Sequence, residues 1–146
     1  MRKPPPSSLP HAELTDAIIG SLYEVHNELG FGFSEHVFRK AMVVALADRG
    51  LRSVIQPPLT VYFRGRMIGH FLPDIVVEDT IIVEVKATAT IDDYAEAQIL
   101  NYLKAAGGGV GLLVNFGRKP EFKRRVMGDP TNSLPVLRER KDRDTK

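Results

Sequence analysis

PDIVVEDTIIVEVK, residues 73–86, combines the carboxylates of Asp74 and Glu84 and the amine of Lys86 with two apolar, β-branched runs. Residues 67–77 and 80–85 have the composition of strands, and the polar residues between them predict a hairpin. Side chains two apart on a strand share a face, so Glu84 and Lys86 point to one side and Val85 to the other. The stretch therefore predicts a β-hairpin with charged groups on one face.

The pairing register of this hairpin decides whether Asp74 meets Glu84. A two-residue loop would place Asp74 opposite Val83, whereas a loop with an odd number of residues, such as 78–80, places it opposite Glu84. A site built from both carboxylates requires the odd-numbered loop.

The chemistry of these groups indicates a hydrolytic metal site. Carboxylate oxygens suit a hard cation such as Mg²⁺, which proteins usually hold through one or two carboxylates, retained waters and substrate phosphate. Such an ion activates water and neutralises phosphate, and Lys86 can orient the water or offset charge on the phosphorane. An exposed cross-strand ion pair would use the same residues, and the hairpin alone leaves both interpretations open.

Composition limits the class of protein. The chain has 146 residues, 43% of them hydrophobic, which is enough for one core but not for two domains of normal size. It has no cysteine, which excludes disulfides, thiolate zinc sites and a cysteine nucleophile. No apolar run approaches the roughly 20 residues of a membrane span, and a proline cluster occupies the place of a signal peptide's apolar stretch. We expect a soluble, cytoplasmic protein without a membrane partner.

Basic residues are concentrated near the end of the chain. Residues 118–146 hold ten Lys or Arg against five Asp or Glu, whereas residues 1–117 hold ten against thirteen. The first part of the segment offers five candidates for phosphate contact: Arg118, Lys119, Lys123, Arg124 and Arg125. The alternative to phosphate contact for this cluster is an ordinary solvated surface, and both interpretations stay open. For residues 138–146 we favour a disordered end.

Periodicity predicts the order α, α, β, β, β, α, β. The predicted helices are 15–29, 35–49 and 92–106, and the predicted strands are 52–56 with 59–63, 67–77, 80–85 and 110–116. The three strands before the last helix are expected to be antiparallel, with a turn at Arg64-Gly65. We divide the chain into a disordered leader (1–12), one domain (13–127) and a charged, disordered tail (128–146).

Residues 32–38, GFSEHVF, resemble the signature of the GxxExxY proteins, a prokaryotic branch of the PD-(D/E)XK nuclease superfamily. Phe38 stands where the signature has tyrosine. The resemblance covers roughly residues 14–126 and includes the hairpin and GLLVNFG at 111–117. It implies an α/β fold with a mixed sheet: the restriction-endonuclease-like αβββαβ core with one extra N-terminal helix. The order read from periodicity agrees with that core.

The resemblance also implies roles for individual residues. Asp74 and Glu84 would be metal ligands, the Val85 carbonyl would complete the shell, and Lys86 would be the catalytic lysine. Glu35 takes the place of the acidic residue on the helix before the sheet, where stabilisation of the helix end is the other interpretation.

Gln98 and Tyr102 share a helix face at a spacing of four residues. They resemble the Gln-x-x-x-Tyr element of RecB-type members of the superfamily, which implies contact with DNA or with the site. From the residues alone, a helix surface and a half-buried aromatic would be the ordinary interpretation. His26 and His36 are left out of the site, because single histidines on amphipathic helices are usually packed and hydrogen-bonded.

The resulting hypothesis is a Mg²⁺-dependent deoxyribonuclease in which Mn²⁺ is able to substitute. Its expected partner is nucleic acid, with DNA favoured over RNA. The alternative is a catalytically weak or inactive nuclease fold that serves as a nucleic-acid-binding or assembly module, since fold does not imply function. A homodimer through apolar surface of the helix at 15–29 is a third hypothesis.

Overall fold

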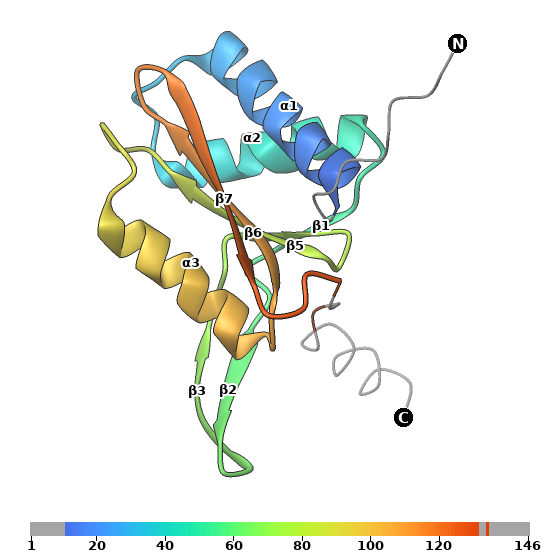
Figure 1. Cartoon of the computed structure of the whole chain (residues 1–146). Helices are drawn as coiled ribbons and strands as arrows, with labels where there is room; N and C mark the ends of the chain where they lie inside the picture. Colours follow the sequence, from blue (N-terminus) through green and yellow to red (C-terminus); the bar gives the residue numbers. More distant parts are fainter. Residues whose placement is uncertain (1–10, 132–133, 135–146) are drawn as a thin grey trace.

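A computed structural model of the protein describes residues 11–131 and 134. Its elements are α1 (Ala12–Leu29), α2 (Glu35–Asp48), β1 (Ser53–Ile55), β2 (Leu59–Phe63), β3 (Arg66–Phe71), β4 (Ile75–Val77), β5 (Ile81–Lys86), α3 (Asp93–Ala105), β6 (Gly109–Phe116) and β7 (Pro120–Met127). A five-stranded sheet, ordered β1-β4-β5-β6-β7, lies between α1 and α2 on one side and α3 on the other (Figure 1). The expected mixed α/β fold is confirmed.

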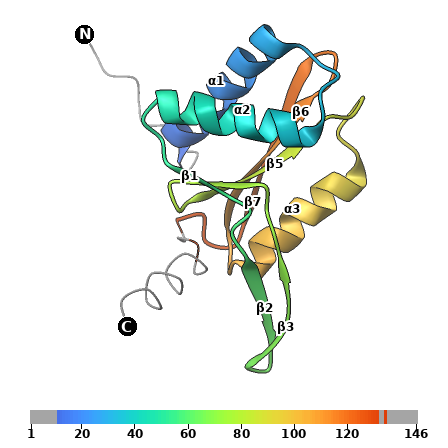
Figure 2. The same ribbon diagram turned by 180° about the vertical axis from the view of Figure 1, so that it is seen from behind.

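Alternation along β5 divides the core into two layers. Ile81, Val83 and Val85 pack with α1 and α2, whereas Ile82 packs with Ile99 and other residues of α3. Strand β5 pairs antiparallel with β4 and parallel with β6, so it is covered on both faces. The view from behind shows α2 crossing the face opposite α3 (Figure 2).

The predicted register of the central hairpin is confirmed. Ile75 pairs with Val83 and Val77 with Ile81, which leaves residues 78–80 as the loop. Glu78 and Asp79 adopt left-handed φ values of 51° and 55°. One step further along the same register, Asp74 lies opposite Glu84.

The predicted strand 67–77 is wrong, because it is two strands in different sheets. β3 ends at Phe71 and pairs with β2, whereas β4 begins at Ile75 and pairs with β1 and β5. Pro73 lies between them and has no N–H to donate to a ladder. Residues 52–63 are split in the same way into β1 and β2, at Pro57 and Pro58.

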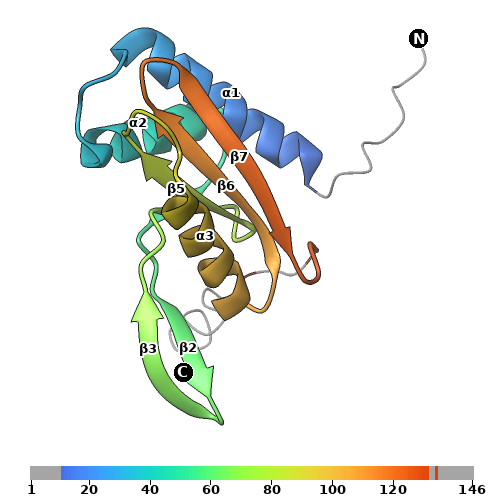
Figure 3. The ribbon, with the colours of Figure 1, turned by 60° about the vertical axis from the view of Figure 1, so that its left-hand side comes forward.

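Strands β2 and β3 form an arm that projects from the rest of the protein (Figure 3). Its turn is the predicted Arg64-Gly65, with φ values of 51° and 75°. Positive φ at both central residues is typical of the type I′ turn of a two-residue hairpin. The arm carries exposed apolar side chains, among them Tyr62, Met67 and Ile68.

The helices agree with the predicted ranges apart from their ends. Ser34 caps α2 by accepting a hydrogen bond from Val37 N, and Asp92 caps α3 by accepting one from Ala95 N. Helix α1 begins at Ala12. No helix within residues 11–131 is long and apolar enough to cross a bilayer.

Strand β7 was not predicted from the sequence, which indicated only a basic cluster there. It forms the edge of the sheet next to β6, whose residues are all buried.

Leu134 packs in the core layer beside α3, and its N–H donates to the Asp79 carbonyl. The proposed leader and tail otherwise lie mostly outside the described residues, so the division of the chain stays a prediction.

Asn115 ties the loop after β5 to β6. Its Oδ1 accepts from Thr88 N at 3.0 Å and its Nδ2 donates to Thr88 O at 2.9 Å, and the side chain is fully buried. This amide therefore completes the backbone hydrogen bonding of a loop residue.

We expect Asn115→Ala to lower the free energy of unfolding by about 2 kcal/mol, because it leaves both Thr88 backbone groups without their partner. Chemical denaturation would measure the loss. Asn101→Ala, at an exposed position on α3, is the matched control and should change stability by less than about 0.5 kcal/mol. Equal losses in the two variants would contradict this role for Asn115.

Candidate active site

Asp74 and Glu84 are each fixed by a hydrogen bond from a backbone N–H across the hairpin. The Asp74 N–H donates to Glu84 Oε1 at 2.8 Å, and the Val85 N–H donates to Asp74 Oδ2 at 2.8 Å. Each carboxylate is thus fixed by the backbone of the opposite strand, at the end of the β4–β5 pairing. The register of the hairpin therefore places each carboxylate beside its backbone donor.

Burial gives this pair an unusual electrostatic state. Glu84 is only 4% exposed, and burial, followed by the negative charge of Asp74, raises the pKa of Glu84 to about 8. The Asp74 N–H and the charge of Lys86 act in the opposite direction. Without a bound cation, the site therefore resists carrying two negative charges.

Arg39 of α2 reaches the same site, and the sequence analysis did not anticipate it. Its Nη1 lies 3.2 Å from Asp74 Oδ1, and the two side chains are 15% and 17% exposed. Its Nη2 lies 3.0 Å from His36 Nδ1, and its buried Nε has no hydrogen-bond partner among the described residues. Asp74 is 35 positions from Arg39, so no local pattern in the sequence signals this contact.

Lys86 ends β5, and strand alternation places it on the same face as Glu84. Its side chain is partly buried, and its charge opposes the rise in the pKa of Glu84. Val85 is fully buried with its side chain in the opposite layer, so only its backbone belongs to the site.

Gln98 and Tyr102 lie on the α3 face that covers the carboxylates. Gln98 Nε2 donates to the Tyr102 hydroxyl at 2.9 Å. Burial raises the pKa of Tyr102 to about 12, with further contributions from the charges of Glu84 and Asp74. The tyrosine is 5% exposed and its ring packs against Phe71. The two residues therefore form a neutral, hydrogen-bonded wall beside the pair.

Glu35 is not gathered with the other carboxylates. It is exposed in the first turn of α2. Within the described part of the chain, no three His, Asp or Glu side chains are placed to hold one ion together. A ligand role for Glu35 stays a prediction.

The histidines contact other protein groups. His26 lies 2.8 Å from the Gly117 carbonyl and stacks on Phe116. His36 contacts Arg39. Phe38, at the tyrosine position of the signature, is fully buried and stacks on Phe116 with ring centroids 4.2 Å apart.

The basic cluster at 118–125 divides into separate groups. Lys123 and Arg125 both pair with Glu96 of α3, with Lys123 Nζ 2.9 Å from Glu96 Oε1. Lys123, followed by Arg125, lowers the pKa of Glu96. Arg124 lies on the other face of β7 by alternation. Arg118 and Lys119 are in the β6–β7 turn, where they line a cavity.

A family model of the PD-(D/E)XK nuclease superfamily matches residues 12–125. The chain therefore belongs to this superfamily, whose nucleases generally use divalent metal ions. No curated protein matches the chain. A solved structure titled "Crystal structure of SSO0001" is similar to it at 14% identity and a TM-score of 0.47, covering 92% of this chain and 68% of that one.

In the absence of metal, Glu84→Gln should stabilise the protein increasingly as pH rises from about 4.5 to about 8. In the folded protein Glu84 keeps its proton up to about pH 8, whereas in the unfolded chain it loses it near 4.5. The folded state binds more protons in this window, so the contribution of Glu84 to stability is complete below it and is lost as pH rises through it.

Denaturation in EDTA at a series of pH values, with wild type and Glu84→Gln compared, measures this effect. Glu28→Gln, at an exposed position on α1, is the control and should follow wild type throughout. A constant difference between wild type and Glu84→Gln across the window would contradict the raised pKa.

Proposed function

We propose that the protein is a Mg²⁺-dependent nuclease that hydrolyses phosphodiester bonds of DNA. The observation that carries the proposal is the pairing of Asp74 with the buried Glu84, both held by the backbone beside Lys86. Membership of the nuclease superfamily supports the same reaction class.

The residues at this site fit a hard divalent cation. Both carboxylates present oxygen donors, and their mutual repulsion is relieved by positive charge between them. Asp74 and Glu84 would hold the ion, with the Val85 carbonyl and Glu35 as further proposed ligands. When bound, the ion supplies a Lewis acid that lowers the pKa of water and neutralises phosphate charge; Mn²⁺ is expected to substitute.

The remaining residues position the substrate and its charges. Lys86 donates from its ammonium group to the attacking water or to a phosphate oxygen, where it offsets charge that develops on the phosphorane. Gln98 and Tyr102 cover the α3 side of the carboxylates and limit the access of water there. Arg39 can hold either Asp74 or a phosphate oxygen, since its guanidinium carries several donors in one plane.

One observation favours a second function, a nucleic-acid-binding module without catalysis. Arg39 already pairs with Asp74, so a cation must compete with it for the carboxylate. In a binding module that ion pair would persist in the presence of metal.

Cleavage assays test the first function. With Mg²⁺ or Mn²⁺, wild type should cut linear or circular DNA, and Lys86→Ala and Glu84→Gln should each lose on the order of 100-fold or more in rate. Lys104→Ala, at an exposed position on α3, is the matched control and should cut as wild type does. Cleavage by both site variants at the wild-type rate, or none by wild type with either metal, would reject the proposal.

Calorimetry with Mn²⁺ tests the competition at Asp74. Arg39→Met should bind the ion about five-fold more tightly than wild type, since removing an ion pair of this kind is worth roughly 1 kcal/mol. Arg49→Met, which removes the exposed pair with Glu24, should leave the affinity unchanged. Unchanged affinity in Arg39→Met would show that Arg39 does not compete for the site.

A further inference from the structure

A cavity of about 490 Å³ lies beyond the end of β5, and no role has been assigned to it. Three connecting segments line it: the α1–α2 connection with Phe31, the loop after β5 with Thr88, and the β6–β7 turn with Arg118 and Lys119. These segments come together at the upper left of the protein (Figure 1). The cavity therefore borders the strand that carries Glu84 and Lys86.

Phe31 lines this cavity and is largely exposed. Its side chain is 55% exposed, and the Arg118 guanidinium carbon lies 5.5 Å from the ring centroid. Gly30 and Gly32 on either side have φ values of 72° and 109°, which shape the connection that carries the ring. The guanidinium lies over one face of the ring, so an unpaired base would stack on the other face.

The charge of the cavity favours an anionic ligand. Arg118 and Lys119 face a single acidic lining residue, Glu121. Unlike Lys123 and Arg125, neither cation forms an ion pair with a carboxylate in the described part of the chain. The lining thus combines an aromatic face with positive charge, which matches the base and the phosphate of a nucleotide.

The cavity is held close to the catalytic strand. Ala87 and Thr88 follow Lys86 directly, and the side-chain amide of Asn115 fixes Thr88 through two hydrogen bonds to its backbone. Because a chain spans at most about 3.6 Å per residue, the Thr88 backbone lies within about 7 Å of the Lys86 backbone. A strand whose scissile phosphate lies at Lys86 therefore reaches the cavity with an adjacent nucleotide.

We propose that this cavity binds an unpaired nucleotide next to the scissile phosphate, with its base stacked on Phe31 and its phosphate held by Arg118 and Lys119. The inference rests on the proposed nuclease function and specifies its substrate as single-stranded or frayed DNA. A base inside a duplex is covered on both faces by its neighbours and must leave the stack to reach Phe31.

Fluorescence anisotropy in EDTA tests the inference with a labelled single-stranded oligonucleotide and a blunt duplex of the same sequence. Wild type should bind the single strand more tightly than the duplex. Phe31→Ala should lose about ten-fold in affinity for the single strand and little for the duplex, whereas Phe31→Trp should retain both affinities. Because Phe31 is exposed, its variants should melt as wild type does; Arg118→Ala provides a second variant with the same expected loss.

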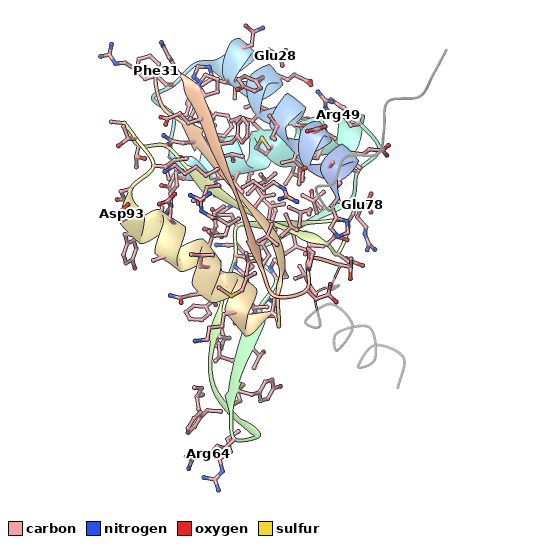
Figure 4. The ribbon with its side chains drawn as sticks, in the orientation of Figure 1. Glu28, Phe31, Arg49, Arg64, Glu78 and Asp93 are labelled. Carbon is pink, nitrogen blue, oxygen red and sulfur yellow. The ribbon has the colours of Figure 1, made fainter. Side chains whose placement is uncertain are left out.

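Phe63→Ala is a matched control. Phe63 is 57% exposed and lies under Arg64, with a guanidinium distance of 5.0 Å. The labelled Arg64 marks this pair at the tip of the arm, at the opposite end of the protein from Phe31 (Figure 4). The control should bind both ligands as wild type does.

Three results would overturn the inference. Phe31→Ala could bind the single strand with wild-type affinity, or it could lose equal affinity for single strand and duplex. Phe63→Ala could also lose as much single-strand affinity as Phe31→Ala. The assay needs neither metal nor cleavage, so its outcome is separate from that of the nuclease assay. Metal-dependent cleavage combined with unaltered single-strand binding by Phe31→Ala would reject this inference alone. Phe31-dependent binding without any cleavage would retain the nucleotide site and reject the nuclease function.

Discussion

The antiparallel pairing of β4 with β5 is the constraint on which the candidate site depends. A shift of one residue would turn every β4 side chain to the other face and separate Asp74 from Glu84. The three-residue loop at 78–80 sets the register, with two of its residues in left-handed conformations. The same pairing brings each carboxylate to a backbone amide of the opposite strand. The register of the hairpin therefore also determines the geometry of the site.

Burial of Glu84 beside the partly exposed Asp74 gives the site its chemical character. Burial of Glu84, followed by the negative charge of Asp74, raises the pKa of Glu84 and favours a bound cation. Arg39 supplies positive charge to Asp74 from the opposite helical layer. A divalent ion and the guanidinium are thus alternative partners for one carboxylate. In our account, an arginine released from Asp74 is available to a phosphate oxygen.

Much of the architecture follows from local signals in the sequence. Ser34 and Asp92 mark the starts of α2 and α3, and the odd-numbered loop predicts the register of the hairpin. The prediction failed where apolar, β-branched composition continues across a break. Pro73 ends one strand pairing and allows another to begin, so residues 67–77 belong to two sheets. Pro73 is the local signal of this break, because it has no N–H to donate to a continuous ladder.

Contacts between distant residues explain what the sequence did not predict at the site. Arg39 and Asp74 are 35 positions apart, and no local pattern indicates their pairing. In the sequence, Lys123 and Arg125 are candidates for phosphate contact. In the structure, both pair with Glu96. Arg118, from the same basic run, lies instead beside Phe31. The sequence therefore indicates where the basic residues lie along the chain. It does not indicate which side chains they contact, because tertiary packing determines those contacts.

The most direct test of the metal centre is a crystal structure with bound Mn²⁺, located by its anomalous scattering. Our account predicts one strong anomalous peak that both Asp74 and Glu84 coordinate, with the Arg39 guanidinium displaced from Asp74. An ordered site at saturating Mn²⁺ with no peak at the two carboxylates, and with Arg39 still paired to Asp74, would contradict the central claim.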